Sequence, residues 1–206
     1  MSASDAILWY DRLDSSNNEA ARLISGLDNL AVIAVREQTA GRGQGDHSWY
    51  SAPGQNLTFS LVLKFPPLNP LPASGILYLT CAITRGIRQY LLGRGVESLI
   101  KWHNDIYVDG RKICGILIEN TISGGLVRSC IAGIGLNLNQ TDFPPELPNP
   151  VSLKQLTLKN YDPATELESL VGELKKSASL LDTEQGRIEL ESYFRKYCFN
   201  VPVSQQ

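Results

Sequence analysis

Two turn signals in the middle of the chain constrain its fold more than any other feature. Asp109-Gly110 and Ser123-Gly124-Gly125 each stand between apolar segments, and Asp-Gly in that position is a strong hairpin signal. Strands are therefore expected at residues 99–102, 106–108, 113–119 and 127–138. Strands joined by short turns predict an antiparallel meander.

Apolar residues at helical spacing predict helices on both sides of this meander. The longest helix is expected at about residues 73–92, and others at residues 19–26, 151–156, 164–181 and 184–197. Further strands are expected at residues 8–13, 31–35 and 57–65. Hairpins combined with helices predict an α+β fold, in which helices back a mixed, mostly antiparallel sheet.

Composition limits the class of protein. The chain has 206 residues, 43% of them hydrophobic, which suits one domain with a sizeable core. A net charge of −2 gives no support for general nucleic-acid or membrane-surface binding. The sequence has neither a secretory signal nor the run of about 18 apolar residues that a membrane span needs. We therefore expect a cytoplasmic protein.

The cysteines are spaced too widely to suggest a metal site or a redox pair. They stand at Cys81, Cys114, Cys130 and Cys198, with no Cys-x-x-Cys motif. Widely spaced cysteines in apolar surroundings are typical of buried free thiols in a reducing compartment.

Residues 38–49 interrupt the apolar pattern with three glycines and several polar side chains, which predicts a loop. Glycines allow a backbone to approach an anion, and Arg42 can pair with a phosphate or a carboxylate. Trp49 offers a face on which an aromatic base could stack. The spacing matches no standard phosphate-binding motif, and a surface loop with a core tryptophan is the alternative.

Lys101, Asn104 and Asp105 gather at the end of an expected strand. An aspartate there could hold Mg²⁺, and the lysine and amide could bind phosphate oxygens. A polar turn between strands would account for the same residues.

Lys112 and Asn137 are two further polar residues in apolar strands. Lys112 follows the hairpin turn and could place an ammonium over a developing negative charge, although exposed turn lysines are common. Asn137 lies in an apolar run and needs polar partners if it is buried. Either a ligand ring or the protein backbone could supply those partners.

In this order, the polar segments resemble the catalytic domain of biotin–protein ligases, also called biotin–[acetyl-CoA-carboxylase] ligases. The matching segments are residues 14–17, 38–43, 49, 101–105, 111–119 and 133–137. The resemblance covers about residues 7–200 and implies the fold shared with class II aminoacyl-tRNA synthetases. It also implies two reactions: biotin and Mg-ATP give biotinyl-5′-AMP, and a lysine of a biotin carboxyl carrier protein then takes the biotinyl group.

The resemblance assigns roles to individual residues. The biotin-binding residues would be Ser15, Ser16, Gln38, Gly41, Arg42, Lys112 and Gly115. The ATP-binding residues would be Gln44, His47, Trp49, Lys101, Asn104 and Asn137. Lys112, Arg42 and Asp105 would be catalytic, and Asp105 would also hold Mg²⁺.

Four positions depart from the family pattern. Gln44 stands where many members have a second arginine, Asp46 where glycine is usual, and His47 where arginine or asparagine is common. His103 replaces the usual proline of the Lys-Trp-Pro-Asn-Asp motif. These changes are expected to alter the binding of ATP or of the adenylate intermediate.

The resemblance also frames the partners. We expect residues 1–200 to form the catalytic domain and 201–206 a tail, without the family's DNA-binding domain or C-terminal β-barrel. DNA is then not a partner, while a homodimer is possible. The alternative functions are a lipoate–protein ligase, whose Arg-Arg-x-x-Gly-Gly pattern this chain lacks, and a non-catalytic module that binds biotin or its adenylate.

Overall fold

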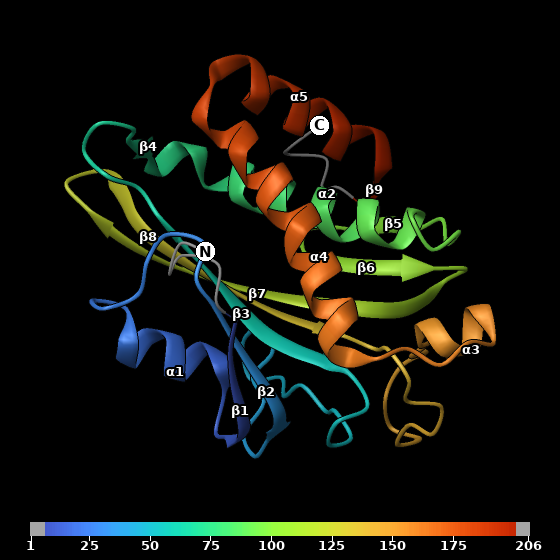
Figure 1. Ribbon diagram of the computed structural model, residues 1–206. Coiled ribbons are helices and arrows are strands. Elements are labelled where there is room, and N and C mark those ends of the chain that lie inside the picture. Colours follow the sequence, from blue (N-terminus) through green and yellow to red (C-terminus); the bar gives the residue numbers. More distant parts are fainter. Residues whose placement is uncertain (1–6, 201–206) are drawn as a thin grey trace.

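One sheet organises the structure, a computed structural model that describes residues 7–200. Within these residues the strand order is β1-β2-β3-β8-β7-β6-β5-β9, and β4 pairs with β8 (Figure 1). The strands are β1 (Ile7–Leu13), β2 (Val32–Gln38), β3 (Leu57–Lys64), β4 (Leu71–Pro72), β5 (Leu99–Lys101), β6 (Asp105–Val108), β7 (Arg111–Ser123), β8 (Leu126–Leu136) and β9 (Cys198–Phe199). The α-helices are α1 (Ser16–Leu23), α2 (Ile76–Leu92), α3 (Leu153–Thr157), α4 (Pro163–Ala178) and α5 (Glu184–Tyr197).

The sheet is mixed, and antiparallel pairs dominate it. Strands β1 and β2 pair in parallel, as do β5 and β9, and the other pairs are antiparallel. A parallel pair needs a crossover connection, and α1 supplies it between β1 and β2. The predicted α+β fold with a mixed, mostly antiparallel sheet is confirmed.

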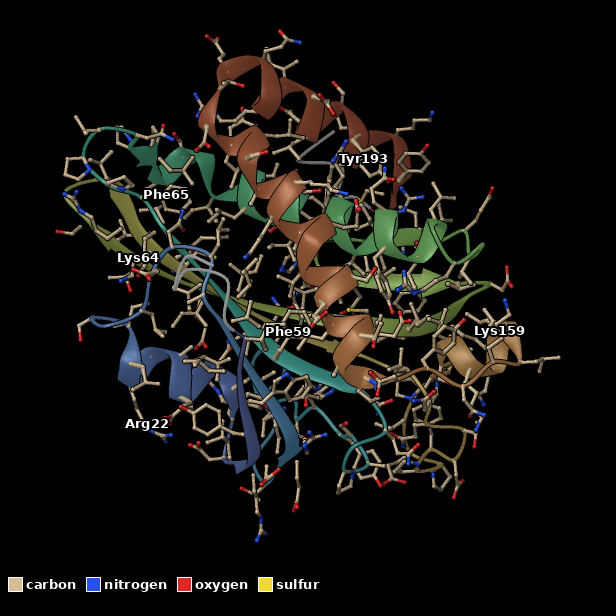
Figure 2. All side chains as sticks on the ribbon, viewed as in Figure 1. Arg22, Phe59, Lys64, Phe65, Lys159 and Tyr193 are labelled. Atoms are coloured by element: carbon tan, nitrogen blue, oxygen red, sulfur yellow. The ribbon has the colours of Figure 1, made fainter. Side chains whose placement is uncertain are left out.

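The two faces of the sheet carry different layers. Alternate residues of a strand point to opposite faces, and this alternation separates two apolar clusters. Leu61 and Ala132 pack in the larger cluster with α2, α4 and α5, whereas Val62 and Ile131 pack with Ala20 of α1. Helix α1 therefore lies on the face opposite the other long helices (Figure 1). In Figure 2, Phe59 lies between β3 and α4, and Arg22 is on the far side with α1.

Several element boundaries differ from the sequence-based expectations. Strand β2 reaches Gln38, which was expected in a loop, and β8 ends at Leu136, so that Asn137 lies beyond the sheet. Helix α4 ends at Ala178, and a 3-10 turn over Ser179–Asp182 follows it. The short strands β4 and β9 were not predicted, because each has two residues and depends on a distant partner.

The cysteine prediction is correct for three of the four residues. Cys81, Cys114 and Cys130 are buried and free, whereas Cys198 is free but only half-buried, at the end of α5. The expected tail, residues 201–206, lies outside the described residues. Within residues 7–200, no helix combines the length and apolar character needed to cross a bilayer.

Candidate active site

The face of the sheet opposite α2, α4 and α5 holds a cavity with two lobes. The first lobe has a volume of about 330 Å³, and its wall includes Ser15, Ser16, Gln38, Gly115, Gly133 and Gly135. The second lobe has a volume of about 350 Å³, and its wall includes Tyr107, Asn137, Phe143, Leu147 and Pro150. Both lobes are also lined by His47, Ser48, Trp49, Lys101, Asp105 and Lys112, so these residues form the boundary between them.

Two glycines on adjacent strands let Trp49 lie against the sheet. Gly115 of β7 and Gly135 of β8 are register partners. A Cβ on Gly115 would lie 2.8 Å from Trp49 Cζ3, and one on Gly135 would lie 2.2 Å from Trp49 Cε2. A side chain at either position would displace the indole, so both glycines are required for Trp49 to pack against the sheet in the cavity. The indole Nε1 is buried and has no hydrogen-bond partner among the described residues.

Lys112 and Asp105 form an ion pair at the boundary between the lobes. Lys112 Nζ lies 2.8 Å from Asp105 Oδ1, and both side chains are partly exposed. The β6–β7 hairpin brings the two residues together, with Asp109 and Gly110 at positive φ in its turn. The backbone of Lys112 also donates to Asn149 O and accepts from Val151 N. A fixed ammonium beside a carboxylate can neutralise an anion where the two lobes meet.

The start of α1 supplies the hydroxyl and amide groups of the first lobe. Ser15 and Ser16 are both buried, and Ser16 N donates to Gln38 Oε1 at 2.8 Å. Ser15 occupies the N-cap position, but its side chain makes no capping bond. The guanidinium of Arg22 holds the pKa of the Asp14 carboxyl well below its usual range, so Asp14 stays ionised just before the helix.

The glycine-rich segment forms the predicted loop, and backbone hydrogen bonds close it. Arg42 and Ser48 make an antiparallel bridge, and Gly43 N donates to His47 O. At its base, Trp49 N donates to Gly41 O at 2.9 Å, and a Cβ on Gly41 would lie 2.4 Å from Trp49 O. This close approach requires glycine at residue 41.

Two side chains of the loop contact residues outside it. Arg42 pairs with Glu119, with Nη2 2.7 Å from Oε1. Gln44 Nε2 lies 3.2 Å from His103 Nε2. Two of the four positions that depart from the family pattern therefore contact each other.

The remaining expected residues also lie at the cavity. Lys101 Nζ is 5.0 Å from the centre of the Tyr107 ring, and Asn104 Nδ2 donates to Ile116 O at 2.7 Å. Asn137 lines the second lobe but is buried, and its Nδ2 donates to Lys112 O and Val151 O. Its amide thus joins the backbone of Lys112 to that of Val151, which is a structural role in this conformation.

Sequence reasoning assigned no role to several residues that line the cavity or contact its lining, among them Asn17, Ser60, Tyr107, Glu119, Phe143 and Leu147. For Ser60, the alternation of Thr58 and Ser60 with apolar neighbours in β3 is a usable signal of a polar sheet face. Phe143 and Leu147 come from an irregular Pro-rich segment, whose path has no periodic signal.

The residues present fit a weakly held Mg²⁺. Among the described residues there is no cluster of three or more side chains that could hold a metal ion. Mg²⁺ usually takes one or two protein carboxylates together with substrate phosphates. Asp105, which lines both lobes, is a suitable carboxylate for that arrangement.

Comparison with known proteins assigns a family to this architecture. Residues 9–137 match the model of the biotin/lipoate A/B protein ligase family. The chain is 33% identical over 176 residues to a biotin–[acetyl-CoA-carboxylase] ligase of Paracoccus denitrificans, an alignment that covers 84% of this chain and 72% of that one. It is 34% identical over 170 residues to the bifunctional ligase/repressor BirA of Bacillus subtilis, covering 80% of this chain and 51% of that one. The chain therefore spans about half the length of the Bacillus relative.

Solved structures show the same fold. The biotin protein ligase from Aquifex aeolicus in complex with biotin and ATP superimposes with a TM-score of 0.79 at 22% identity. That match covers 95% of this chain and 79% of the Aquifex chain. The ligase from Leishmania major in complex with biotinyl-5-AMP gives a TM-score of 0.68 at 23% identity.

Proposed function

This chain belongs to the biotin/lipoate A/B protein ligase family, and from that premise we propose that it is an ATP-dependent biotin–protein ligase. Its substrates would be biotin, ATP and a lysine of a biotin carboxyl carrier protein. It would act in the cytoplasm. The observation that carries the proposal is the Lys112–Asp105 pair, which stands where the two lobes meet.

The first reaction joins biotin to the nucleotide. A biotin carboxylate oxygen attacks the α-phosphorus of ATP, a C–O–P anhydride forms, and the bond to pyrophosphate breaks. Both reactants are anions, so a cation must stand between them. Lys112 Nζ is suitably placed, and its pairing with Asp105 keeps it directed toward the boundary of the lobes. Mg²⁺ held by Asp105 and the phosphates would neutralise further charge.

The second reaction passes the biotinyl group to the carrier. The ε-amine of the carrier lysine attacks the acyl carbon, an amide bond forms, the amine loses a proton, and AMP leaves. A mixed anhydride hydrolyses readily, so water must be kept from it. The closed loop from Gly41 to Trp49, which lines both lobes, is suited to cover the intermediate.

The division of the cavity supports the assignment of each substrate. The first lobe offers hydroxyl and amide groups at Ser15, Ser16 and Gln38, which suits a neutral polar ring. The second lobe offers aromatic and apolar walls at Tyr107, Phe143 and Leu147, which suits a purine base. We therefore assign the ring of biotin to the first lobe and adenine to the second.

Biotin-dependent exchange of pyrophosphate into ATP tests the proposal, with lipoate and octanoate as parallel substrates. Exchange with biotin alone is the expected result. Exchange with lipoate or octanoate would change the substrate class. Biotin binding without exchange would support a non-catalytic binding module and would overturn the assignment as a ligase.

A further inference from the structure

Glu119 lies on β7 and joins two parts of the first lobe. Arg42 Nη2 lies 2.7 Å from Glu119 Oε1, and Asn17 Nδ2 lies 2.8 Å from Glu119 Oε2. One carboxylate therefore holds both the glycine-rich loop and the start of α1. The roles that the family resemblance assigns include one for Arg42 but none for Glu119 or Asn17.

The orientation of the Asn17 amide follows from this contact. An ionised carboxylate accepts hydrogen bonds and donates none, so the NH₂ group of Asn17 must face Glu119. The same group also donates to Leu117 O at the longer distance of 3.4 Å, which favours the same orientation. The amide oxygen then faces Ser60, whose Oγ lies 2.5 Å from Asn17 Oδ1. Asn17 is 3% exposed and its side chain crosses over Gly133, where a Cβ would lie 2.3 Å from Oδ1. Burial and this close contact both hold the amide in place.

The direction of hydrogen bonding passes from Asn17 to Ser16. Ser60 Oγ also lies 2.8 Å from Ser16 Oγ, and Ser60 is fully buried. A serine hydroxyl has one proton to donate, and Ser60 gives its proton to Asn17 Oδ1. Ser16 must then donate its own proton to Ser60. The groups that Ser16 still offers to the cavity are the lone pairs of its oxygen.

Gln38 supplies a hydrogen-bond donor beside the acceptor of Ser16. Ser16 N donates to Gln38 Oε1 at 2.8 Å, so the amide nitrogen of Gln38 is its remaining donor in the lobe. The wall thus offers an acceptor at Ser16 and a donor at Gln38. A cyclic urea carries an N–H next to a carbonyl and is complementary to that pair.

We propose that Glu119 is a positioning residue that sets the hydrogen-bond polarity of the first lobe. Through Asn17 and Ser60 it makes Ser16 an acceptor, so the lobe selects a ligand that presents an N–H at this point. Through its second oxygen it anchors Arg42. The selection of an N–H rests on the proposed function, because it takes a ureido ring as the ligand, whereas the anchoring of Arg42 does not.

Binding measurements on Glu119→Gln test the polarity. The probes are biotin and its cyclic carbamate analogues, in which a ring oxygen replaces one ureido N–H or the other. In one of the two analogues the ring oxygen faces Ser16, so that two acceptors meet, and the wild-type protein should bind this analogue at least roughly tenfold more weakly than biotin. The ratio of these two affinities is the quantity compared between variants. The glutamine amide can donate to Asn17, which lets Asn17 turn over and Ser16 donate, so the penalty against that analogue should shrink several-fold.

Matched variants keep this result interpretable. Glu191→Gln removes a carboxylate that pairs with Arg195 at 2.8 Å, far from the cavity, and should keep the wild-type ratio of affinities. Ser60→Ala removes the acceptor for the Ser16 proton and should lower the ratio as Glu119→Gln does, even if one of the two variants folds poorly. A wild-type ratio in both site variants, or equal affinity of the wild type for all three ligands, would overturn the polarity.

Tryptic cleavage after Arg42 in the ligand-free protein tests the anchor separately. Glu119→Gln should be cut there several-fold faster than the wild type, while Glu191→Gln should match the wild type. Unchanged cleavage would overturn the anchor. If Glu119→Gln is cut faster but the wild-type protein does not bind biotin, the proposed function and the selection of an N–H are wrong. The anchoring of Arg42 by Glu119 is then still supported.

Discussion

The indole of Trp49 lies so close to Gly135 that a Cβ on this glycine would be 2.2 Å from Cε2. This contact makes the position of the tryptophan depend on a missing side chain on the neighbouring strand. Because the backbone of β8 is held by β3 and β7 on both sides, the indole and not the strand must move when a side chain is added.

Gly135→Ala should therefore displace Trp49 and weaken nucleotide binding. Overpacking of this kind costs about 1–3 kcal/mol of stability, which a urea titration would detect, and the affinity for ATP should fall roughly tenfold or more. Gly172→Ala is the matched control, since a Cβ on Gly172 meets no atom within 4 Å. That variant should bind ATP normally and be as stable as the wild type or slightly more so. Normal ATP binding in Gly135→Ala would show that Trp49 does not contribute to binding adenine.

Lys112→Ala should strongly reduce adenylation. The ammonium at the boundary of the lobes is lost, and removal of one preorganised donor typically costs about 10²–10³ in rate. Pyrophosphate exchange measures the effect, and circular dichroism checks the fold. Lys176→Ala, which breaks an exposed pair with Glu173 at 2.6 Å, should exchange at the wild-type rate. Near-normal exchange in Lys112→Ala would exclude the lysine from the chemistry.

Asp105→Asn separates two tasks of the carboxylate. The amide keeps the shape but neither neutralises Lys112 nor binds a divalent cation well, so exchange should fall roughly tenfold or more. If Asp105 holds Mg²⁺, the concentration of Mg²⁺ for half-maximal exchange should also rise. An unchanged Mg²⁺ dependence with reduced exchange would mean that Asp105 acts through Lys112 alone. Asp142→Asn, at an exposed residue, is the control and should change neither quantity.

Gln44→Arg should prolong retention of the intermediate. An arginine at this position adds a charge that can pair with a phosphate, whereas Gln44 now contacts His103 at 3.2 Å. The half-life of the bound adenylate should rise about fivefold, measured by following release of labelled biotinyl-AMP. Gln44→Ala should release the adenylate at the wild-type rate or faster. Equal half-lives in the arginine and alanine variants would show that position 44 does not contact the phosphate.

The buried thiols should make the fold sensitive to alkali. Burial raises the pKa of Cys81 and Cys130 from the ordinary 9.0 to about 12. A folded-state pKa above the unfolded value gives stability that is complete below pH 9 and is lost as the pH rises toward 12. The free energy of unfolding should therefore fall less steeply between pH 9 and pH 11 in Cys130→Ala than in the wild type.

Cys198→Ala provides a graded control for the thiol effect. This half-buried thiol has its pKa raised only to about 11, so its removal should flatten the alkaline slope less than removal of Cys130. Identical slopes for the wild type and all cysteine variants would assign the alkaline loss to other groups.

The sequence predicted the site residues better than it predicted their contacts. Ser16, Gln38, Trp49, Asp105 and Lys112 all line the cavity. Trp49, Asp105 and Lys112 stand out as interruptions of the apolar pattern, whereas Ser16 and Gln38 were named only through the family resemblance. The pairing of Arg42 with Glu119 was not predictable, since it joins residues 77 positions apart and depends on the sheet register. The contacts of Ser60 with Ser16 and Asn17 depend on distant residues in the same way, although the alternation in β3 places its side chain on the polar face.

The fold shows the same division between local and distant information. The hairpin turn at Asp109-Gly110 and helix α2 have strong local signals, and both are present. Strand β9 has two residues and pairs with β5, about half the chain away, so no local pattern could reveal it. The parallel pairing of β1 with β2 likewise follows from the packing of α1 and not from either strand alone.

The single strand β7 carries Gly115, Leu117 and Glu119 on the cavity face. Ser60 and Gly133 lie level with Leu117, and the Lys112 ammonium lies beside Gly115, two residues or roughly 7 Å along the strand. The backbone of β7 thus fixes the distance between the groups that bind the ring and the Lys112 ammonium. Biotin homologues with one methylene more or fewer should exchange more slowly, because hydrogen-bonded strands cannot stretch to fit them.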